Sequence, residues 1–146
     1  MIIRPCQPAD AEVLVRVFTK NTPTAFGTNE INDYADFLQT NTDPYFVVEH
    51  DGGLIGACGY YIRPDGKTAR IVWIFADPDA KGLRVGSALL THCLNLIRQQ
   101  PEIDLIECQT SQVAYQFFKR FGFQLQGIQP DYWTPGLDLY FMTATP

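Results

Sequence analysis

Residues 69–76, ARIVWIFA, are apolar nearly throughout and end at Asp77 and Pro78. A strand with one face in water alternates apolar and polar side chains, whereas a strand covered on both faces is apolar along its length. This run therefore predicts a central strand of a sheet with packed layers on both sides. Helices on the two faces of a sheet are the usual layers, so the run favours a mixed α/β fold.

Helix and strand patterns alternate around this central strand. Asp51-Gly52-Gly53 and Pro64-Asp65-Gly66 interrupt residues 45–78, which predicts an antiparallel meander of three strands. Residues 29–40 have the spacing of an amphipathic helix. The other expected elements are a strand at 1–6, a helix at 8–20, a helix of about fifteen residues after the loop at 78–84, a strand at 103–110, a helix at 111–121 and strands at 121–127 and 137–143.

Length and charge limit the kinds of protein that the chain can be. The 146 residues are the length of one domain that can bury a core, so we expect one domain over residues 1–146. The chain has 11 Lys plus Arg against 16 Asp plus Glu, a net charge of −5. A general polyanion-binding surface is therefore not expected, which argues against nucleic acid as a partner.

The N-terminal segment and the cysteines indicate a cytoplasmic protein. MIIRPCQPADAE has a proline and charges where a signal peptide needs a continuous apolar segment, and no other run approaches a membrane span. We therefore expect no membrane partner. The four cysteines (Cys6, Cys58, Cys93 and Cys108) have neither metal-ligand spacing nor the density of a disulfide scaffold. They are expected to be buried, reduced thiols, and no metal is expected.

The segment PDAKGLRVGSALL places a glycine-containing loop between the central strand and a helix. The first N–H groups of a helix have no intrahelical acceptor and lie at its positive end. Gly82 and Gly86 allow close approach of a ligand, Ser87 can cap the helix or bond an oxyanion, and Lys81 and Arg84 add positive charge. The loop therefore predicts a pyrophosphate site, with an ordinary solvated helix start as the alternative.

This loop differs from a P-loop and from the three-glycine dinucleotide fingerprint. It resembles the pyrophosphate-binding motif of the GCN5-related N-acetyltransferases (GNAT), in which Arg or Gln is followed by two residues, Gly, one residue, and Gly or Ala. Lys81, Arg84 and Gly86 occupy these positions, so Lys81 stands for Arg or Gln and Arg84 replaces the first glycine. AYQFFKRFGF, residues 114–123, resembles the family's second motif, and the order of elements is similar over essentially the whole chain.

The resemblance implies a mostly antiparallel sheet with a parallel pair splayed at the acetyl-CoA site, and transfer of an acetyl group from acetyl-CoA, the co-substrate, to an amine. Family members hold the pantetheine and the thioester carbonyl on backbone N–H groups at the motif end of the central strand. A fixed donor aimed at the developing oxyanion contributes about 3 to 4 kcal/mol. The cofactor-binding residues implied in this way are Ile74, Phe75, Ala76, Lys81, Gly82, Leu83, Arg84, Val85, Gly86, Ser87 and Phe118.

The general acid departs from the family pattern. Phe118 occupies the position at which the family commonly has a tyrosine that protonates the leaving thiolate, and a phenyl ring has no proton to donate. General acid catalysis contributes about 10²- to 10⁴-fold, but a thiolate with a pKa of about 8.5 can also be protonated later by water. Tyr115, three residues earlier on the same helix, is the candidate donor, with a core or surface aromatic as the alternative.

The general base also departs from the family pattern. An alkylamine is protonated at neutral pH and must lose a proton before it attacks. Some family members use a glutamate on the central strand, but residues 69–76 contain no carboxylate. Glu107 on the following strand is the candidate base, and the alternative is a strand-end carboxylate paired with Arg or Lys. Glu49 and His50 are weaker candidates, and His92 is expected on a helix surface.

Acceptor recognition in this fold usually falls to the segment around the first two helices and to the loop before the last strand. The loop, IQPDYWTPGLD, contains Asp131, Tyr132 and Trp133 between two prolines. Aromatic faces and a carboxylate suit a cationic amine, whereas a hydrophobic plug or a homodimer contact is the alternative. Three acidic residues of the first segment either surround the same cleft or are solvated, which is usual for acidic residues on an exposed helix face: Glu30, Asp33 and Asp36.

The sequence therefore predicts an acetyl-CoA-dependent N-acetyltransferase that acts on a primary amine. A small-molecule amine is preferred to a peptide or protein amine. The alternative is an acyl-CoA-binding sensor domain that has the same fold without turnover, because Phe118 and Arg84 both depart from the family motifs.

Overall fold

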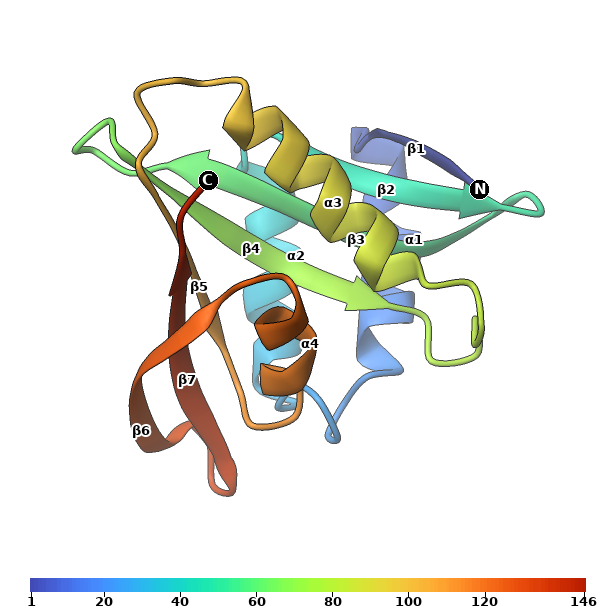
Figure 1. Ribbon diagram of the computed structural model, residues 1–146. Coiled ribbons are helices and arrows are strands. Elements are labelled where there is room, and N and C mark those ends of the chain that lie inside the picture. The colour runs from blue at the N-terminus through green and yellow to red at the C-terminus, as the bar shows by residue number, and fades with distance from the viewer.

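The computed structural model describes residues 1–146 and contains one seven-stranded sheet in the order β1-β2-β3-β4-β5-β7-β6 (Figure 1). Neighbouring strands are antiparallel except β4 and β5, which run parallel. This topology confirms the expected mixed α/β fold. The strands are β1 (Ile2–Pro5), β2 (Tyr45–His50), β3 (Gly53–Ile62), β4 (Thr68–Ala76), β5 (Leu105–Thr110), β6 (Gln124–Thr134) and β7 (Leu137–Ala144).

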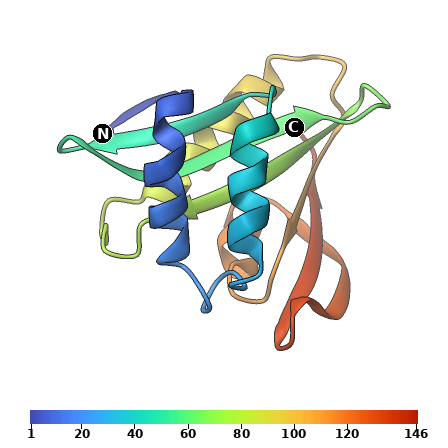
Figure 2. The same cartoon turned by 180° about the vertical axis from the view of Figure 1, so that it is seen from behind.

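Helices cover both faces of the sheet, as the apolar sequence of β4 predicted. On one face lie α1 (Ala11–Thr19), which follows a 3-10 turn (Pro8–Asp10), and α2 (Glu30–Thr40) (Figure 2). On the other face lie α3 (Val85–Arg98) and α4 (Tyr115–Arg120) (Figure 1). From β4, Ile71 enters the core on the α3 side and Phe75 enters the core on the α1 and α2 side.

The parallel pair separates part-way along its length. The register of β4 against β5 ends where Ile71 lies opposite Cys108, although β4 continues to Ala76 and β5 to Thr110. Trp73 follows this point with a φ of 46°, at an irregularity in the register between β3 and β4. The ends of β4 and β5 are therefore not paired with each other, which is the splay that the resemblance implied.

Two elements differ from the sequence-based prediction. The helix expected over residues 111–121 is limited to Tyr115–Arg120, because the hydroxyl of Ser111 accepts the N–H of Val113 (3.2 Å) in a preceding turn. β6 continues to Thr134, through the segment predicted to be a loop. β6 is the edge strand, and its register against β7 is interrupted between Gln129 and Thr134, so Pro130 lies there without breaking a regular ladder.

The cysteines lie in apolar surroundings, as predicted. Cys58, Cys93 and Cys108 are buried, Cys6 is half-buried, and all four are unpaired. Burial raises the pKa of the Cys58 thiol well above its usual value. None of the helices has the length and apolar character needed to cross a membrane.

Candidate active site

The N-terminus of α3 presents a group of free backbone donors. Arg84 precedes the helix with a φ of 53° and a ψ of 43°, a left-handed conformation that turns the chain into α3. The N–H groups of residues 84–87 make no backbone hydrogen bond, and the first bond of the helix runs from the Ala88 N–H to the Arg84 carbonyl (3.1 Å). Four adjacent donors at the positive end of a helix are suited to an anion.

The side chains around these donors add positive charge and leave space. Lys81 and Arg84 are exposed. Lys20, and not Lys81, pairs with the acidic residues Asp77 and Asp79, at 2.7 and 2.8 Å. A Cβ added at Gly82 would meet no atom within 4 Å. The donors, the two cations and the open backbone together fit a diphosphate group.

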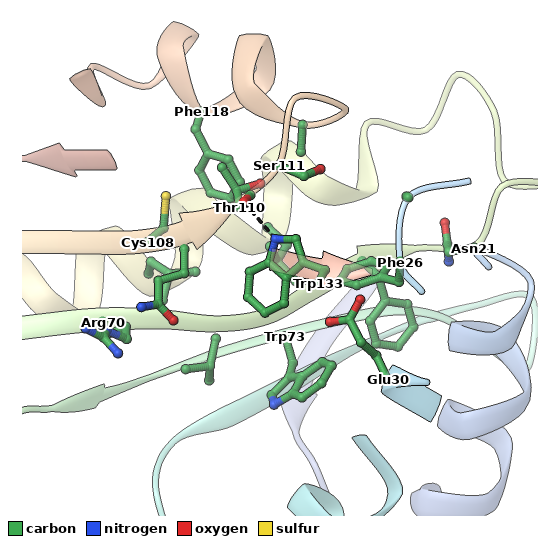
Figure 3. A pocket seen from close by; sticks show the side chains of 17 residues that line it. Asn21, Phe26, Glu30, Arg70, Trp73, Cys108, Thr110, Ser111, Phe118 and Trp133 are labelled. Atoms are coloured by element: carbon green, nitrogen blue, oxygen red, sulfur yellow. Dashed lines mark hydrogen bonds between the residues drawn. The ribbon is translucent and has the colours of Figure 1, made fainter. Parts of the chain in front are cut away.

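A cavity of about 330 Å³ lies at the splay of β4 and β5 (Figure 3). Side chains from both cores line it. Ile74 and Phe118 pack with the core on the α3 side, whereas Trp73 and Phe75 pack with the core on the α1 and α2 side. The cavity is therefore lined by side chains of both cores at the point where β4 and β5 part.

Two buried tyrosines hold the bend of β4 at Trp73. The Tyr45 hydroxyl donates to the Trp73 carbonyl (2.8 Å). A hydroxyl has one proton, so Tyr45 must accept the hydrogen bond from the Tyr34 hydroxyl (2.9 Å). Burial raises the pKa of both phenols above the usual value, so both stay neutral donors. The position of the Trp73 carbonyl is thus set by side chains from α2 and β2.

The end of β4 directs backbone groups into the splay. The Asp77 N–H donates to the Ile55 carbonyl of β3 (2.8 Å). Because successive peptide groups of a strand point to opposite sides, the N–H of Ala76 points away from β3 and toward the splay. The carbonyl of Ala76 accepts a hydrogen bond from the Asn21 side chain (3.1 Å), which holds the peptide that follows Ala76. A backbone donor is therefore available where β5 no longer pairs with β4.

Glu30, the first residue of α2, directs its carboxylate into the cavity (Figure 3). It is only 5% exposed, and its Oε2 accepts the Gly27 N–H (2.8 Å). It is absent from all seven salt bridges of the chain. Burial raises the pKa of the Glu30 carboxyl, the Gly27 hydrogen bond lowers it, and the nearby charge of Asp33 adds a smaller increase. The α1 and α2 side of the sheet thus carries a buried carboxylate without a cationic partner.

Residues 12–123, which include the N-terminus of α3, the splay and Glu30, match the family model described as Acetyltransferase (GNAT) family. The chain belongs to this family. A protein of Bacillus subtilis (strain 168) with the provisional name ribosomal protein bS18-alanine N-acetyltransferase is 32% identical over 115 residues, which are 77% of this chain and 75% of that protein. This membership confirms the expected acetyl-CoA-dependent N-acetyltransferase.

Solved structures of similar fold include two acetyltransferases at low sequence identity. The crystal structure of ribosomal-protein-alanine N-acetyltransferase from Brucella melitensis has a TM-score of 0.79 and 18% identity, with 100% of both chains covered. The structure of yncA, provisionally described as an acetyltransferase, from Salmonella typhimurium with its cofactor acetyl-CoA has a TM-score of 0.73 and 20% identity, with 99% of this chain and 93% of that chain covered. At this identity the likeness supports the fold of this acetyltransferase.

Glu107, predicted as the base, does not line the cavity of this acetyltransferase. It is 4% exposed, and its Oε1 accepts hydrogen bonds from Arg63 Nη1 (2.8 Å) and Arg70 Nε (2.7 Å). The structure thus gives Glu107 the paired arrangement that was the alternative to a base. Its role as a base stays a prediction.

The two candidates on α4 lie in different surroundings. Phe118 is 2% exposed, lines the cavity and packs edge-on against Phe123. Tyr115 packs against Tyr140, with 5.4 Å between ring centroids, and Lys119 lies over its ring. Tyr115 does not line the cavity. Of these two predicted residues, the structure brings only Phe118 to the splay.

Of the three residues predicted to bind the acceptor, only Trp133 lines the cavity. Its Nε1 donates to the Thr110 carbonyl at the end of β5 (3.1 Å), which orients the indole (Figure 3). Tyr132 is 44% exposed. The Asp131 carboxylate accepts the Gly136 N–H within the hairpin (2.7 Å), and its role in acceptor binding stays a prediction.

The weaker candidates for a base lie elsewhere. Glu49 accepts a hydrogen bond from Arg4 on β1 (2.9 Å), and His50 ends β2. His92 packs edge-on against Phe46, with 4.5 Å between ring centroids. None of these three residues lines the cavity.

For Glu30 the sequence left two alternatives, a place at the cleft and a solvated helix face, and Glu30 lines the cavity. A signal was present, because Tyr34 and Leu38 follow Glu30 at intervals of four residues and helical spacing therefore places Glu30 on the apolar face. Phe26 and Trp73 line the cavity beside it but carry no comparable signal. Whether Phe26 and Trp73 lie side by side depends on how the segment before α2 packs on β4.

Proposed function

We propose that this enzyme transfers the acetyl group of acetyl-CoA to the primary amine of a small molecule by direct attack of the amine on the thioester. The observation that carries the proposal is the cavity at the splay, which is lined by side chains of both cores and by Glu30. The free N–H groups before α3 lie on one face of the sheet, and α2 with the buried carboxylate of Glu30 lies on the other face. A diphosphate-bearing donor and a cationic acceptor can therefore meet at the splay from opposite faces.

The residues of the chain bind and orient in this proposal. The N–H groups of residues 84–87, with Lys81 and Arg84, would hold the diphosphate of CoA. The activated acetyl group is supplied by acetyl-CoA. The Ala76 N–H, turned toward the splay, would donate to the thioester oxygen as negative charge develops there. Removal of such a donor typically costs about 3 to 4 kcal/mol of transition-state stabilisation.

A general acid is not required for this reaction to proceed. Phe118 is the side chain of α4 that reaches the cavity, and it has no proton to donate. The leaving thiolate has a pKa of about 8.5, so it is stable enough to leave and take a proton from water. We therefore propose a reaction without an obligatory tyrosine acid, which is slower than one with such a residue.

A second candidate acceptor is the α-amine at the N-terminus of a protein. The name of the Bacillus relative supports it, since that protein shares 32% identity with this chain. The cavity wall supports a slender acceptor, because the Asn29 side chain donates to the Trp133 carbonyl (2.9 Å) and thereby joins α2 to the hairpin. A small amine or a flexible terminus fits such a site better than a lysine on a rigid surface.

The proposed function is tested first by a thermal-shift titration with acetyl-CoA, with CoA and ATP as comparison ligands. A ligand at 100-fold excess over Kd stabilises the native state by about 2.7 kcal/mol, which corresponds to roughly 5 to 10 °C in a domain of this size. We expect this shift with acetyl-CoA and CoA but not with ATP. Absence of a shift at millimolar acetyl-CoA would contradict the proposal.

A charge-reversal pair tests whether the loop before α3 is the binding site. Lys81→Glu should weaken acetyl-CoA binding about tenfold, because a charge-assisted contact to phosphate contributes about 1.5 kcal/mol or more. Lys67→Glu, an exposed lysine in the turn between β3 and β4, is the matched control and should leave the affinity unchanged. Release of the CoA thiol is then measured with a panel of amines and with a peptide that has an N-terminal alanine. Thiol release that depends on the acceptor indicates acetyl transfer, whereas binding of acetyl-CoA without thiol release would indicate a sensor domain.

A further inference from the structure

Glu30 is unusual among the acidic residues of the chain. Asp10 and Glu107 are also buried, but arginines hold both: Arg4 pairs with Asp10 at 2.8 Å, and Arg63 pairs with Glu107 at 2.8 Å. Glu30 has one polar partner, the Gly27 N–H. Burial of a carboxylate without a cation is unfavourable, so a cationic ligand that supplied the missing charge would be stabilised there.

The walls near this carboxylate are aromatic. Figure 3 shows the Glu30 carboxylate pointing into the space bounded by Phe26, Trp73 and Trp133. Trp73 packs on the buried ring of Tyr34, with 5.2 Å between centroids, so its position is fixed by the core. Aromatic faces attract an alkylammonium group, and they also contact an apolar substituent.

The position of Glu30 places it on the acceptor side. The N–H groups that suit a diphosphate belong to α3, on the opposite face of the sheet. Side chains of both cores line the cavity where β4 and β5 part. An amine held by Glu30 would therefore approach the splay, and the N–H of Ala76, from the face opposite to the donor.

From this geometry we propose that Glu30 binds the ammonium group of the acceptor and accepts its proton, and that the acceptor is a primary alkylamine with an apolar or aromatic body. This inference rests on the proposed function, because it names the acceptor class and the base of that reaction. Glu30 is then a catalytic residue, whereas the paired Glu107 is structural.

The proton balance of the step is complete with these groups. The ammonium gives one proton to Glu30, and the neutral nitrogen attacks the thioester carbonyl carbon. The C–N bond forms and the C–S bond breaks, so that CoA leaves as the thiolate. The nitrogen loses a second proton to the thiolate through water and keeps one as the amide N–H. Glu30 returns its proton to solvent.

The groups that face Glu30 are consistent with a base. Asp33 on α2 raises the pKa of Glu30, as burial does more strongly, and the Gly27 N–H lowers it. The other charged residue that lines the cavity is Arg70 of β4, and it is engaged by Glu107. Cys108 of β5 also lines the cavity, but burial raises its pKa so that it stays a neutral thiol. No lysine, histidine or tyrosine lines the cavity.

The test compares wild type with Glu30→Gln on two amines, 2-phenylethylamine and 2,2,2-trifluoroethylamine. The first is an ammonium ion at neutral pH, and the fluorines of the second leave it mostly unprotonated. The Gln side chain can still accept the Gly27 N–H, so the variant should fold, and its melting temperature should equal or exceed that of wild type at neutral pH. Asp36→Asn, an exposed carboxylate on the same helix, is the matched control.

With 2-phenylethylamine we expect Glu30→Gln to lower kcat/KM at least 100-fold at pH 7. The variant should recover about tenfold per pH unit as the amine deprotonates, whereas wild type should stay nearly flat up to about pH 9. With trifluoroethylamine the loss should be under tenfold. Asp36→Asn should behave as wild type with both amines.

Three results would overturn the inference while the proposed function stands. The first is acetylation of 2-phenylethylamine by Glu30→Gln within threefold of wild type with the same pH profile. The second is an equal loss of activity on both amines, which indicates a structural role for Glu30. The third is a pH-dependent loss in Glu107→Gln instead of Glu30→Gln, which identifies Glu107 as the base. Binding of acetyl-CoA without acetylation of either amine or of the peptide with an N-terminal alanine would overturn the proposed function and the inference together.

Discussion

Removal of the Tyr45 hydroxyl tests how the bend of β4 is held. In Tyr45→Phe the ring stays in place, but two partners lose their hydrogen bond: the Tyr34 hydroxyl, which is fully buried, and the Trp73 carbonyl. A buried polar group without a partner costs about 1 to 3 kcal/mol. Two such groups should lower the free energy of unfolding by about 2 to 6 kcal/mol, which is roughly 6 to 18 °C in melting temperature.

A double-mutant cycle of Tyr34→Phe and Tyr45→Phe measures whether the two hydroxyl groups act together. Tyr34→Phe alone leaves the Tyr45 hydroxyl bonded to Trp73, so it should cost only about 0.5 to 1.5 kcal/mol. The double variant also lacks the Tyr34 hydroxyl, which has no hydrogen-bond partner in Tyr45→Phe. The double variant should therefore be no less stable than Tyr45→Phe, with a coupling energy of at least about 1 kcal/mol.

Urea denaturation of the four proteins measures this cycle. The order of stability should be wild type, Tyr34→Phe, and then the two proteins that lack the Tyr45 hydroxyl. Additive effects of the two substitutions, or a cost for Tyr45→Phe no larger than that for Tyr34→Phe, would refute the hydrogen-bonded chain from Tyr34 through Tyr45 to Trp73.

Three further substitutions test other parts of the structure. Arg84 has a φ of 53°, a conformation that costs a non-glycine residue about 1 to 2 kcal/mol. Arg84→Gly should therefore have a higher melting temperature than Arg84→Ala. Both variants should weaken CoA binding equally, as measured by titration calorimetry. Phe118→Tyr restores a proton donor at the splay, so it should raise kcat for thiol release about tenfold without a change in CoA affinity. An unchanged kcat would indicate that the thiolate does not form at the splay. The Arg4 hydrogen bond lowers the pKa of Asp10, so its stabilisation is present at neutral pH and is lost as pH falls through the folded-state pKa. Asp10→Asn should therefore cost about 1 to 3 kcal/mol at pH 7 and progressively less in acid, as measured by urea denaturation at both pH values.

Much of the fold follows from patterns within single segments. The apolar run of β4 requires cover on both faces, and the glycine-containing loop after it opens a helix with free N–H groups. Turn residues at Asp51-Gly52-Gly53 and Pro64-Asp65-Gly66 divide the meander where the strands end. These features depend on backbone preferences and on neighbours within a few residues, which is why they could be predicted without tertiary contacts.

The extent of the last hairpin could not be predicted in this way. Pro130 and Asp131 favour a loop by their local preferences, and yet β6 continues through them to Thr134. The edge position of β6 and its interrupted register against β7 decide the outcome, because a proline there does not break a regular ladder. An edge position is a property of the whole sheet and is not visible in the segment.

The identity of the carboxylate in the cavity was likewise decided by tertiary structure. Glu107 and Glu30 are both acidic residues near the expected cleft, and the sequence favoured Glu107 as the base because it lies on the parallel strand beside the expected splay. Arg63 and Arg70, 44 and 37 residues away along the chain, pair with Glu107, whereas Glu30 is buried without a cation. Which charges are paired depends on side chains brought together from distant elements, and pairing determines whether a buried carboxylate stabilises the fold or remains free to bind an amine.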